Sequence, residues 1–218
     1  FADIYMKQKT VTSGFSIMGQ SQPGEEKIQE IWITDDKIAT ISETESIIMY
    51  NTTNKIVFIN HENKSYYDMV MDMESMTAGT EEDMDEEEKT AMKNMMASMG
   101  NMEITITPAN KTQKIGQWHC KKYIQKMKLF TGPMESVIWA SDEIDIDYDQ
   151  YAKFMTSMMA KMPGMQKAMA NYMKELKKMK GVAVKTITNT KIMGQEMKSS
   201  TELLEYKKSK APASIFVI

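Results

Sequence analysis

The chain has 218 residues, 42% of them hydrophobic and 26% charged, which is the composition of an ordinary globular protein. All 27 basic residues are lysine and the net charge is −3, so the chain lacks both the guanidinium groups and the positive field that favour nucleic-acid binding. Its single cysteine, Cys120, excludes an intrachain disulfide, and no apolar run approaches the roughly 18 residues of a membrane-spanning helix.

Residues 1–79 are predicted to form a meander of short strands. The segments expected as strands are rich in Ile, Val and aromatic residues and are separated by polar turns; they are 28–34, 37–41, 46–50 and 55–60. Residues 47–50 and 56–59 are apolar on both faces of the expected strands. We therefore expect another element to cover the second face of this part of the sheet.

Residues 80–100 are predicted to form a first helix. Thr80 and Asp83 are spaced as a capping box, and Gly100 is a typical helix end. The methionines of this segment recur at i, i+3, i+4 and i+7, which places them on one helix face; they are Met92, Met95, Met96 and Met99.

The second half of the chain is predicted to alternate strands, helix and strands. Residues 102–146 contain strands, residues 149–180 form a second helix, and residues 182–206 form closing strands. Pro163 and Gly164 should kink the second helix. A second stripe of methionines follows one face of this helix, with Met155, Met158, Met159, Met162, Met165, Met169 and Met173. The predicted fold is a single α+β domain over residues 1–218, in which a curved antiparallel sheet, a half-barrel, packs on two Met-rich helices.

Three stretches carry a resemblance to known proteins. They are the early strands with 18–20 and 30–32, the block 116–123, and the segment 138–141 leading into 147–148. Together they resemble an uncharacterised family of bacterial exported domains, often classed as lipoproteins. The order of elements is also similar to the lipoprotein-carrier (LolA/LolB-like) superfamily, in which a curved sheet and helices enclose an apolar cavity for acyl chains.

This resemblance implies a location in the periplasm or at the outer membrane. It also implies that a signal peptide and a lipid-modified cysteine, which would anchor the protein to a membrane, precede Phe1. The strands that are apolar on both faces, the Met-rich helices and this resemblance together favour a non-catalytic envelope protein that binds a lipid, an acyl chain or another apolar ligand.

The methionine stripes are the candidate ligand-binding surface. Methionine is flexible and polarizable, so such a face either fills an irregular core or lines a cavity for an apolar guest. Both readings stay open at this point. The residues expected to line or flank a cavity are Trp32, Met92, Met95, Met96, Met99, Trp139, Met155, Met158, Met159 and Met162.

Two other functions are weighed against apolar binding. One is a structural or interaction protein of the envelope with a fully packed core. The other is a Cu(I)-binding protein, because Met69, Met71 and Met73 place three soft thioethers on one face of a strand. Catalysis is not expected, because His119 and Cys120 are neighbours and would point to opposite faces of a strand. No cofactor is expected either.

Overall fold

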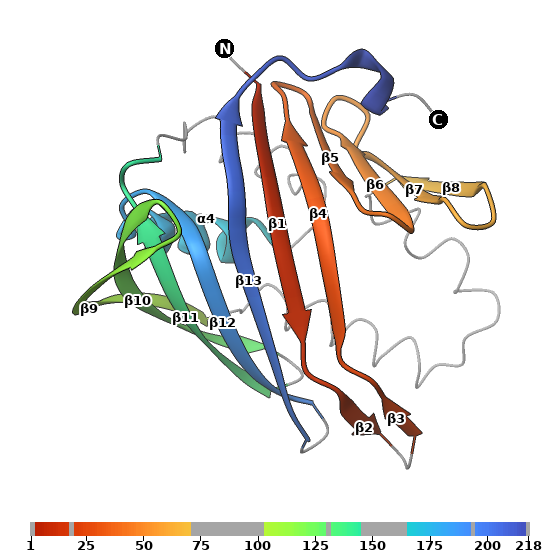
Figure 1. Cartoon of the computed structure of the whole chain (residues 1–218). Helices are drawn as coiled ribbons and strands as arrows, with labels where there is room; N and C mark the ends of the chain where they lie inside the picture. Colours follow the sequence, from red (N-terminus) through yellow and green to blue (C-terminus); the bar gives the residue numbers. More distant parts are fainter. Residues whose placement is uncertain are drawn as a thin grey trace.

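A computed structural model describes residues 3–17, 20–70, 103–129, 132–144, 165–192 and 195–216. Most of these residues belong to one antiparallel sheet of 11 strands (Figure 1). Its strands in chain order are β1 (Ile4–Thr12), β4 (Glu25–Ile33), β5 (Lys37–Ile41), β6 (Glu45–Tyr50), β7 (Lys55–Asn60), β8 (Ser65–Val70), β9 (Glu103–Ile115), β10 (Trp118–Leu129), β11 (Gly132–Ser141), β12 (Val182–Ile192) and β13 (Gln195–Lys208). A separate hairpin is formed by β2 (Phe15–Ile17) and β3 (Gln20–Gln22), and the described helices are α4 (Met165–Leu176) and the 3-10 helix η1 (Ala213–Phe216).

The first and last strands of the sheet lie side by side in its middle. The strand order is β8-β7-β6-β5-β4-β1-β13-β12-β11-β10-β9, and β1 pairs with β13 from Ile4 opposite Lys208 to Thr12 opposite Ser199. Within the described residues the sheet is open, with β8 and β9 as its edges. It is also strongly curved, so that β9 to β12 turn behind the central strands (Figure 1).

The structure corrects the predicted fold class. The curved antiparallel sheet is present, but the expectation of an α+β domain built on two Met-rich helices is wrong, because the described residues form an 11-stranded sheet with the single α-helix α4. Methionine periodicity shows which face of a helix would be apolar, but it does not show how much of the chain forms helix rather than strand. The strands β9 to β13 are each 10 to 14 residues long and dominate the second half of the described chain. The predicted first helix, 80–100, and residues 149–164 of the second lie outside the described residues.

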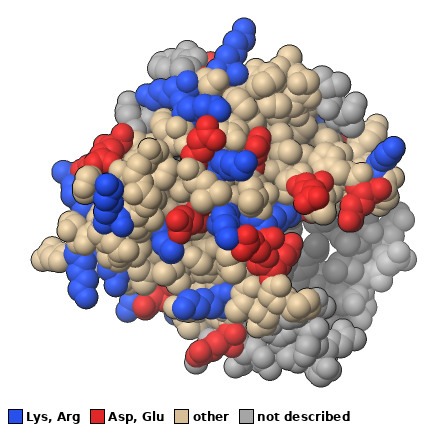
Figure 2. Space-filling view, in the orientation of Figure 1, with Lys and Arg blue, Asp and Glu red and all other residues tan. Residues whose placement is uncertain are grey.

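One face of the sheet carries α4 and is called the helix-bearing face. It includes Ile106, Tyr123 and Ile138, which share a buried cluster with Met173 of the helix. The opposite face, called the outer face, is crossed by ion pairs between neighbouring strands, such as Lys9 with Glu26, Lys7 with Glu30 and Lys185 with Glu202. Lysine and acidic side chains are accordingly interspersed over this face (Figure 2). The outer face of the central strands is therefore charged rather than apolar.

The C-terminal segment covers the outer face of β5 to β7. Ile48 and Val57 are fully buried there with Trp32, and Ile215 and Phe216 pack against this cluster. The Tyr50 hydroxyl donates a hydrogen bond to the Phe216 carbonyl at 3.1 Å. The sequence predicts a cover for strands that are apolar on both faces, and the structure confirms it.

Strand limits in the first half agree closely with the sequence patterns. The predicted strands 37–41 and 55–60 coincide with β5 and β7, and the turn after Asn60 is present. In the second half, β9 continues as far as Ile115. Its later residues are polar, so the register with β10, rather than apolar periodicity, holds them in the sheet.

Candidate apolar binding face

Helix α4 is fixed to the edge strand β9 on the helix-bearing face. The Ile106 N–H donates a hydrogen bond to Glu175 Oε2 at 2.7 Å, and the Asn171 side-chain amide donates to the Ile104 carbonyl at 3.5 Å. The Lys180 N–H, just after the helix, donates to the Tyr123 hydroxyl at 3.3 Å. These contacts occupy backbone groups that an edge strand would otherwise leave open.

The Glu175 carboxylate is almost fully buried in this arrangement. The Lys178 ammonium donates to its Oε1 atom at 2.5 Å, so both carboxylate oxygens have a donor. The hydrogen bond from Lys178, followed by that from the Ile106 N–H, holds the pKa of the Glu175 carboxyl below its usual range. Glu175 is therefore ionised at neutral pH and acts as an anchor for the helix.

A row of thioethers crosses the helix-bearing face beside α4. The row follows directly paired residues of neighbouring strands from β13 to β9. In order, they are Met197, Thr190, Met134, Met127 and Ile104. Directly paired residues lie on the same face of a sheet, so these five side chains form one line. Ile104 is buried and the three methionines are half-buried. We call this line the thioether row.

Two rows of hydroxyl groups lie next to the thioether row on the same face. One of them contains Thr10, Thr201 and Thr186, and the Thr10 and Thr201 hydroxyls are hydrogen-bonded at 3.0 Å. In the other, the Ser136 and Thr188 hydroxyls are hydrogen-bonded at 2.9 Å. The face therefore passes from apolar near β9 to polar but uncharged near β1.

A groove of about 890 Å³ borders the thioether row at the end of β9 to β12. Met127, Met134 and Thr190 line it from the row itself. Most of its other lining residues, such as Lys126 and Glu135, alternate with them and belong to the opposite face of the strands, where these two form an ion pair at 3.7 Å. The groove is therefore lined by thioethers from one face of the sheet and by charged side chains from the other.

Neither of the two tryptophans expected at a cavity belongs to the cluster under α4. Trp32 lies in the cluster that η1 covers, and Trp139 packs against a separate buried cluster that includes Cys120 and Val184. Trp32 is 8% exposed and its ring lies against Tyr5, with the centroids 4.7 Å apart. Trp139 lies between Ile138 and Ala140 in β11, so alternation turns its ring away from α4. The Lys122 ammonium lies 5.9 Å from the centroid of that ring.

The methionines expected to line a cavity are not among the residues that the structure describes. These are Met92, Met95, Met96, Met99, Met155, Met158, Met159 and Met162. Two methionines of the second stripe lie in α4 and contact the sheet. Met173 is buried in the cluster between α4 and the strands, and Met169 packs against the same cluster. The thioether row was missed by the sequence reasoning. The alternation of Met134, Ser136 and Ile138 along one strand could have revealed it, because residues two apart share a face.

His119 and Cys120 lie in β10 and are separated as strand alternation predicts. The His119 side chain is 74% exposed, whereas Cys120 is 1% exposed and its Sγ lies 3.7 Å from the Trp118 carbonyl. Burial raises the pKa of the Cys120 thiol, which keeps it protonated and a poor nucleophile. These two side chains do not form a nucleophile–base pair.

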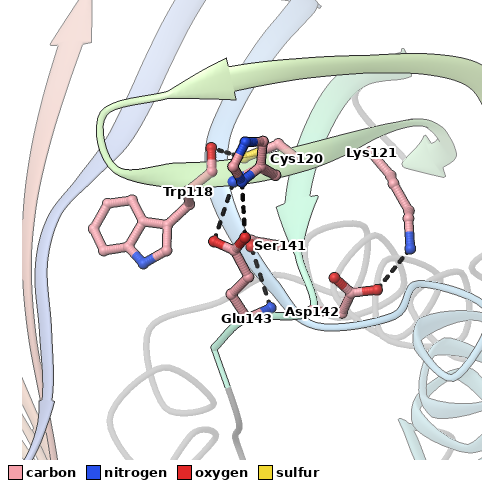
Figure 3. A network of polar contacts seen from close by, with 7 residues as sticks. Trp118, Cys120, Lys121, Ser141, Asp142 and Glu143 are labelled. Carbon is pink, nitrogen blue, oxygen red and sulfur yellow. Dashed lines mark hydrogen bonds and ion pairs between the residues drawn. The ribbon is translucent and has the colours of Figure 1, made fainter.

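His119 is instead held by Glu143, in the segment that follows β11. Figure 3 shows Glu143 and Asp142 in this segment, with Lys121 of β10 paired to Asp142. The His119 Nδ1 lies 2.9 Å from Glu143 Oε1, and the His119 backbone N–H donates to Glu143 Oε2 at 3.2 Å. These hydrogen bonds hold the pKa of the Glu143 carboxyl below its usual range. The Lys121 ammonium pairs with Asp142 at 2.6 Å, so β10 and this segment are tied at two adjacent points.

Neither the models of known protein families nor the curated protein sequences contain a match to this chain. Within the described residues, no three His, Cys, Asp or Glu side chains come together as metal ligands. The Met69, Met71 and Met73 cluster is described only at Met69, in β8. No helix in the described part of the chain has the length and apolar character needed to cross a membrane.

Proposed function

We propose that the protein binds an apolar ligand, such as a lipid acyl chain, along the thioether row. The observation that carries the proposal is the groove of about 890 Å³ that Met127 and Met134 line. Its volume is within the range of about 300–1,000 Å³ that is typical of small-molecule sites. Flexible thioethers adapt to chains of different shape, which suits a ligand without a rigid outline.

The surroundings of the thioether row favour a ligand with one polar end. Hydroxyl pairs lie on one side of the row, and lysine and glutamate also line the groove. An acyl chain against the methionines would leave its head group near these polar side chains. A purely hydrocarbon ligand would offer no polar group to these hydroxyl, lysine and glutamate side chains.

The proposed biological setting is the bacterial envelope, where the protein would act without catalysis. This part rests on the resemblance of its strand segments to exported domains. The buried, protonated thiol of Cys120 also supports a non-catalytic role. Membrane attachment would then come from a lipid-modified cysteine upstream of Phe1. The full-length gene sequence tests that attachment directly.

Two measurements test ligand binding. Native mass spectrometry and solvent extraction of the purified protein should release co-bound lipid. A fluorescent fatty acid should bind the purified protein, and Met134→Lys should weaken this binding about tenfold, or about 1.4 kcal/mol, because a charge is placed in the apolar lining.

The matched control is Ile28→Lys, which adds the same charge at an exposed position of the outer face. This variant should bind the fluorescent fatty acid as the unmodified protein does. The proposal fails if no lipid is extracted and the probe does not bind. It also fails if Ile28→Lys and Met134→Lys reduce binding equally.

A further inference from the structure

The two edge strands of the sheet, β9 and β8, differ in what binds their outward-facing backbone groups. At β9 the side chains of Glu175 and Asn171 bind backbone groups of the edge strand. At the other edge, β7 is the only strand in the described residues that pairs with β8. A strand edge left open in this way is a template for pairing with another chain.

Side chains on both faces of β8 are exposed. Tyr66 and Tyr67 are 59% and 63% exposed, more than any other large apolar side chain in the described part of the chain. The Tyr67 ring is stacked on Phe58 with the centroids 4.8 Å apart, so it is held in place although it is exposed. The β7–β8 hairpin also extends away from the rest of the sheet (Figure 1).

Of the features that usually protect an edge strand, β8 has a charged residue, Asp68, but lacks three others. Natural edges carry lysine, proline or a β-bulge to prevent pairing. The strand reads Ser-Tyr-Tyr-Asp-Met-Val, and its pairing with β7 is continuous from Ser65 to Val70 without a register shift. Aromatic residues of this kind are enriched in protein interfaces.

We propose that β8 pairs with β8 of a second copy of this chain, antiparallel and with Tyr66 opposite Tyr66. In this register, Asp68 of each copy lies beside the turn that ends at Lys64 of the other, within reach of the lysine side chain. Two ion pairs therefore flank a central pair of tyrosines, and the contact is identical from both sides, as a two-fold interface requires. Asp68 already lies 2.7 Å from Lys55 of its own chain, so the two lysines would share its carboxylate.

Analytical ultracentrifugation over a wide range of protein concentrations tests the proposal. The unmodified protein should form dimers. Lys64→Asp should raise the dimer dissociation constant by about tenfold or more, because it places an acidic residue beside Asp68 at both ends of the interface. Tyr66→Lys should do the same by adding charge at the centre. Lys111→Asp, an exposed change on β9, is the control and should leave the constant unchanged.

Cysteine cross-linking tests the register independently of affinity. Directly opposite residues have Cα atoms about 4.5–5.5 Å apart, which is within the range of about 4.4–6.8 Å for a disulfide. Tyr66→Cys should therefore form a disulfide-linked dimer under mild oxidation. Met69→Cys should not, since its two copies would be about 20 Å apart along the strands. Cys120 is buried and should not compete.

Several results would overturn the proposal. One is an unmodified protein that stays monomeric at every concentration, which would leave the edge to a different partner. Another is a dimer that tolerates Lys64→Asp and Tyr66→Lys, which would place the interface elsewhere. Cross-linking at Met69→Cys in preference to Tyr66→Cys would exclude the register. An unchanged thermal unfolding midpoint for each variant confirms that the fold is intact.

Discussion

The Glu175 carboxylate in α4 accepts a hydrogen bond from the backbone N–H of Ile106 in the edge strand β9, at 2.7 Å. This contact joins the described α-helix to the sheet edge and satisfies a buried donor. Glu175→Ala should therefore increase hydrogen exchange at Ile106 and lower the urea midpoint of unfolding. Glu175→Gln keeps an acceptor oxygen and should have a smaller effect. Equal effects of the two variants would show that the hydrogen bond to Ile106 contributes nothing.

The same carboxylate should make stability depend on pH. Its pKa is lower in the folded chain than in the unfolded one, so the contribution is present above the unfolded pKa and is lost as the pH falls through the folded pKa. Urea midpoints measured from about pH 5 to about pH 2 should show this loss, and Glu175→Gln should reduce the slope. An identical slope in the variant would contradict the assignment.

The cluster under η1 should be a major source of stability. Ile48 is fully buried there, and Ile48→Ala should lower the free energy of unfolding by about 2–5 kcal/mol, because it leaves a cavity. Ile28→Ala, at an exposed position of the outer face, should change it by less than about 0.5 kcal/mol. Urea unfolding monitored by tryptophan fluorescence measures both. A small effect at Ile48 would mean that this cluster is loosely packed.

Gly181, in the link between α4 and β12, is required by a close backbone contact with Ser141 at the end of β11. Its φ is 83°, and a Cβ atom there would lie 1.8 Å from the Ser141 carbonyl oxygen. Gly181→Ala should therefore lower the free energy of unfolding by more than the cost of about 1–2 kcal/mol for a left-handed residue. Thermal unfolding provides the measurement.

Gly116 is the matched control for Gly181. Its φ is 56°, but an added Cβ would meet only the Trp118 ring, at 3.7 Å. Gly116→Ala should show the cost of about 1–2 kcal/mol for the backbone alone. If both variants lose the same free energy of unfolding, the contact with the Ser141 carbonyl is not the reason that position 181 requires glycine.

Tyr5 should ionise late in an alkaline titration. Burial, followed by the nearby Glu30 carboxylate, raises the pKa of Tyr5 to about 12. The folded pKa is above the unfolded value, so stability should fall as the pH rises from about 10 toward 12. Tyrosinate absorbance should contain a component near pH 12 that disappears in Tyr5→Phe. A titration of Tyr5→Phe that matches the unmodified protein would refute this.

The sequence predicted local features of the fold well. The strands 37–41 and 55–60 were correct because short, β-branched segments between polar turns depend on nearby residues alone. The need for a cover over 47–50 and 56–59 also followed from the sequence. The fold class was wrong because methionine spacing was given more weight than the long strands after residue 102. The thioether row was missed because Met127, Met134 and Met197 belong to three different strands.

The sequence by itself determined where β4, β5, β6 and β7 lie and that residues 47–50 and 56–59 are apolar on both faces. Only the tertiary structure decided that β1 pairs with β13, that η1 is the cover for β5 to β7, and that α4 protects the β9 edge. The physical reason is that alternation and turn chemistry act between neighbours, whereas strand order depends on contacts such as Thr10 with Thr201, 191 positions apart. Such contacts form only when the whole sheet assembles, so no local pattern specifies them.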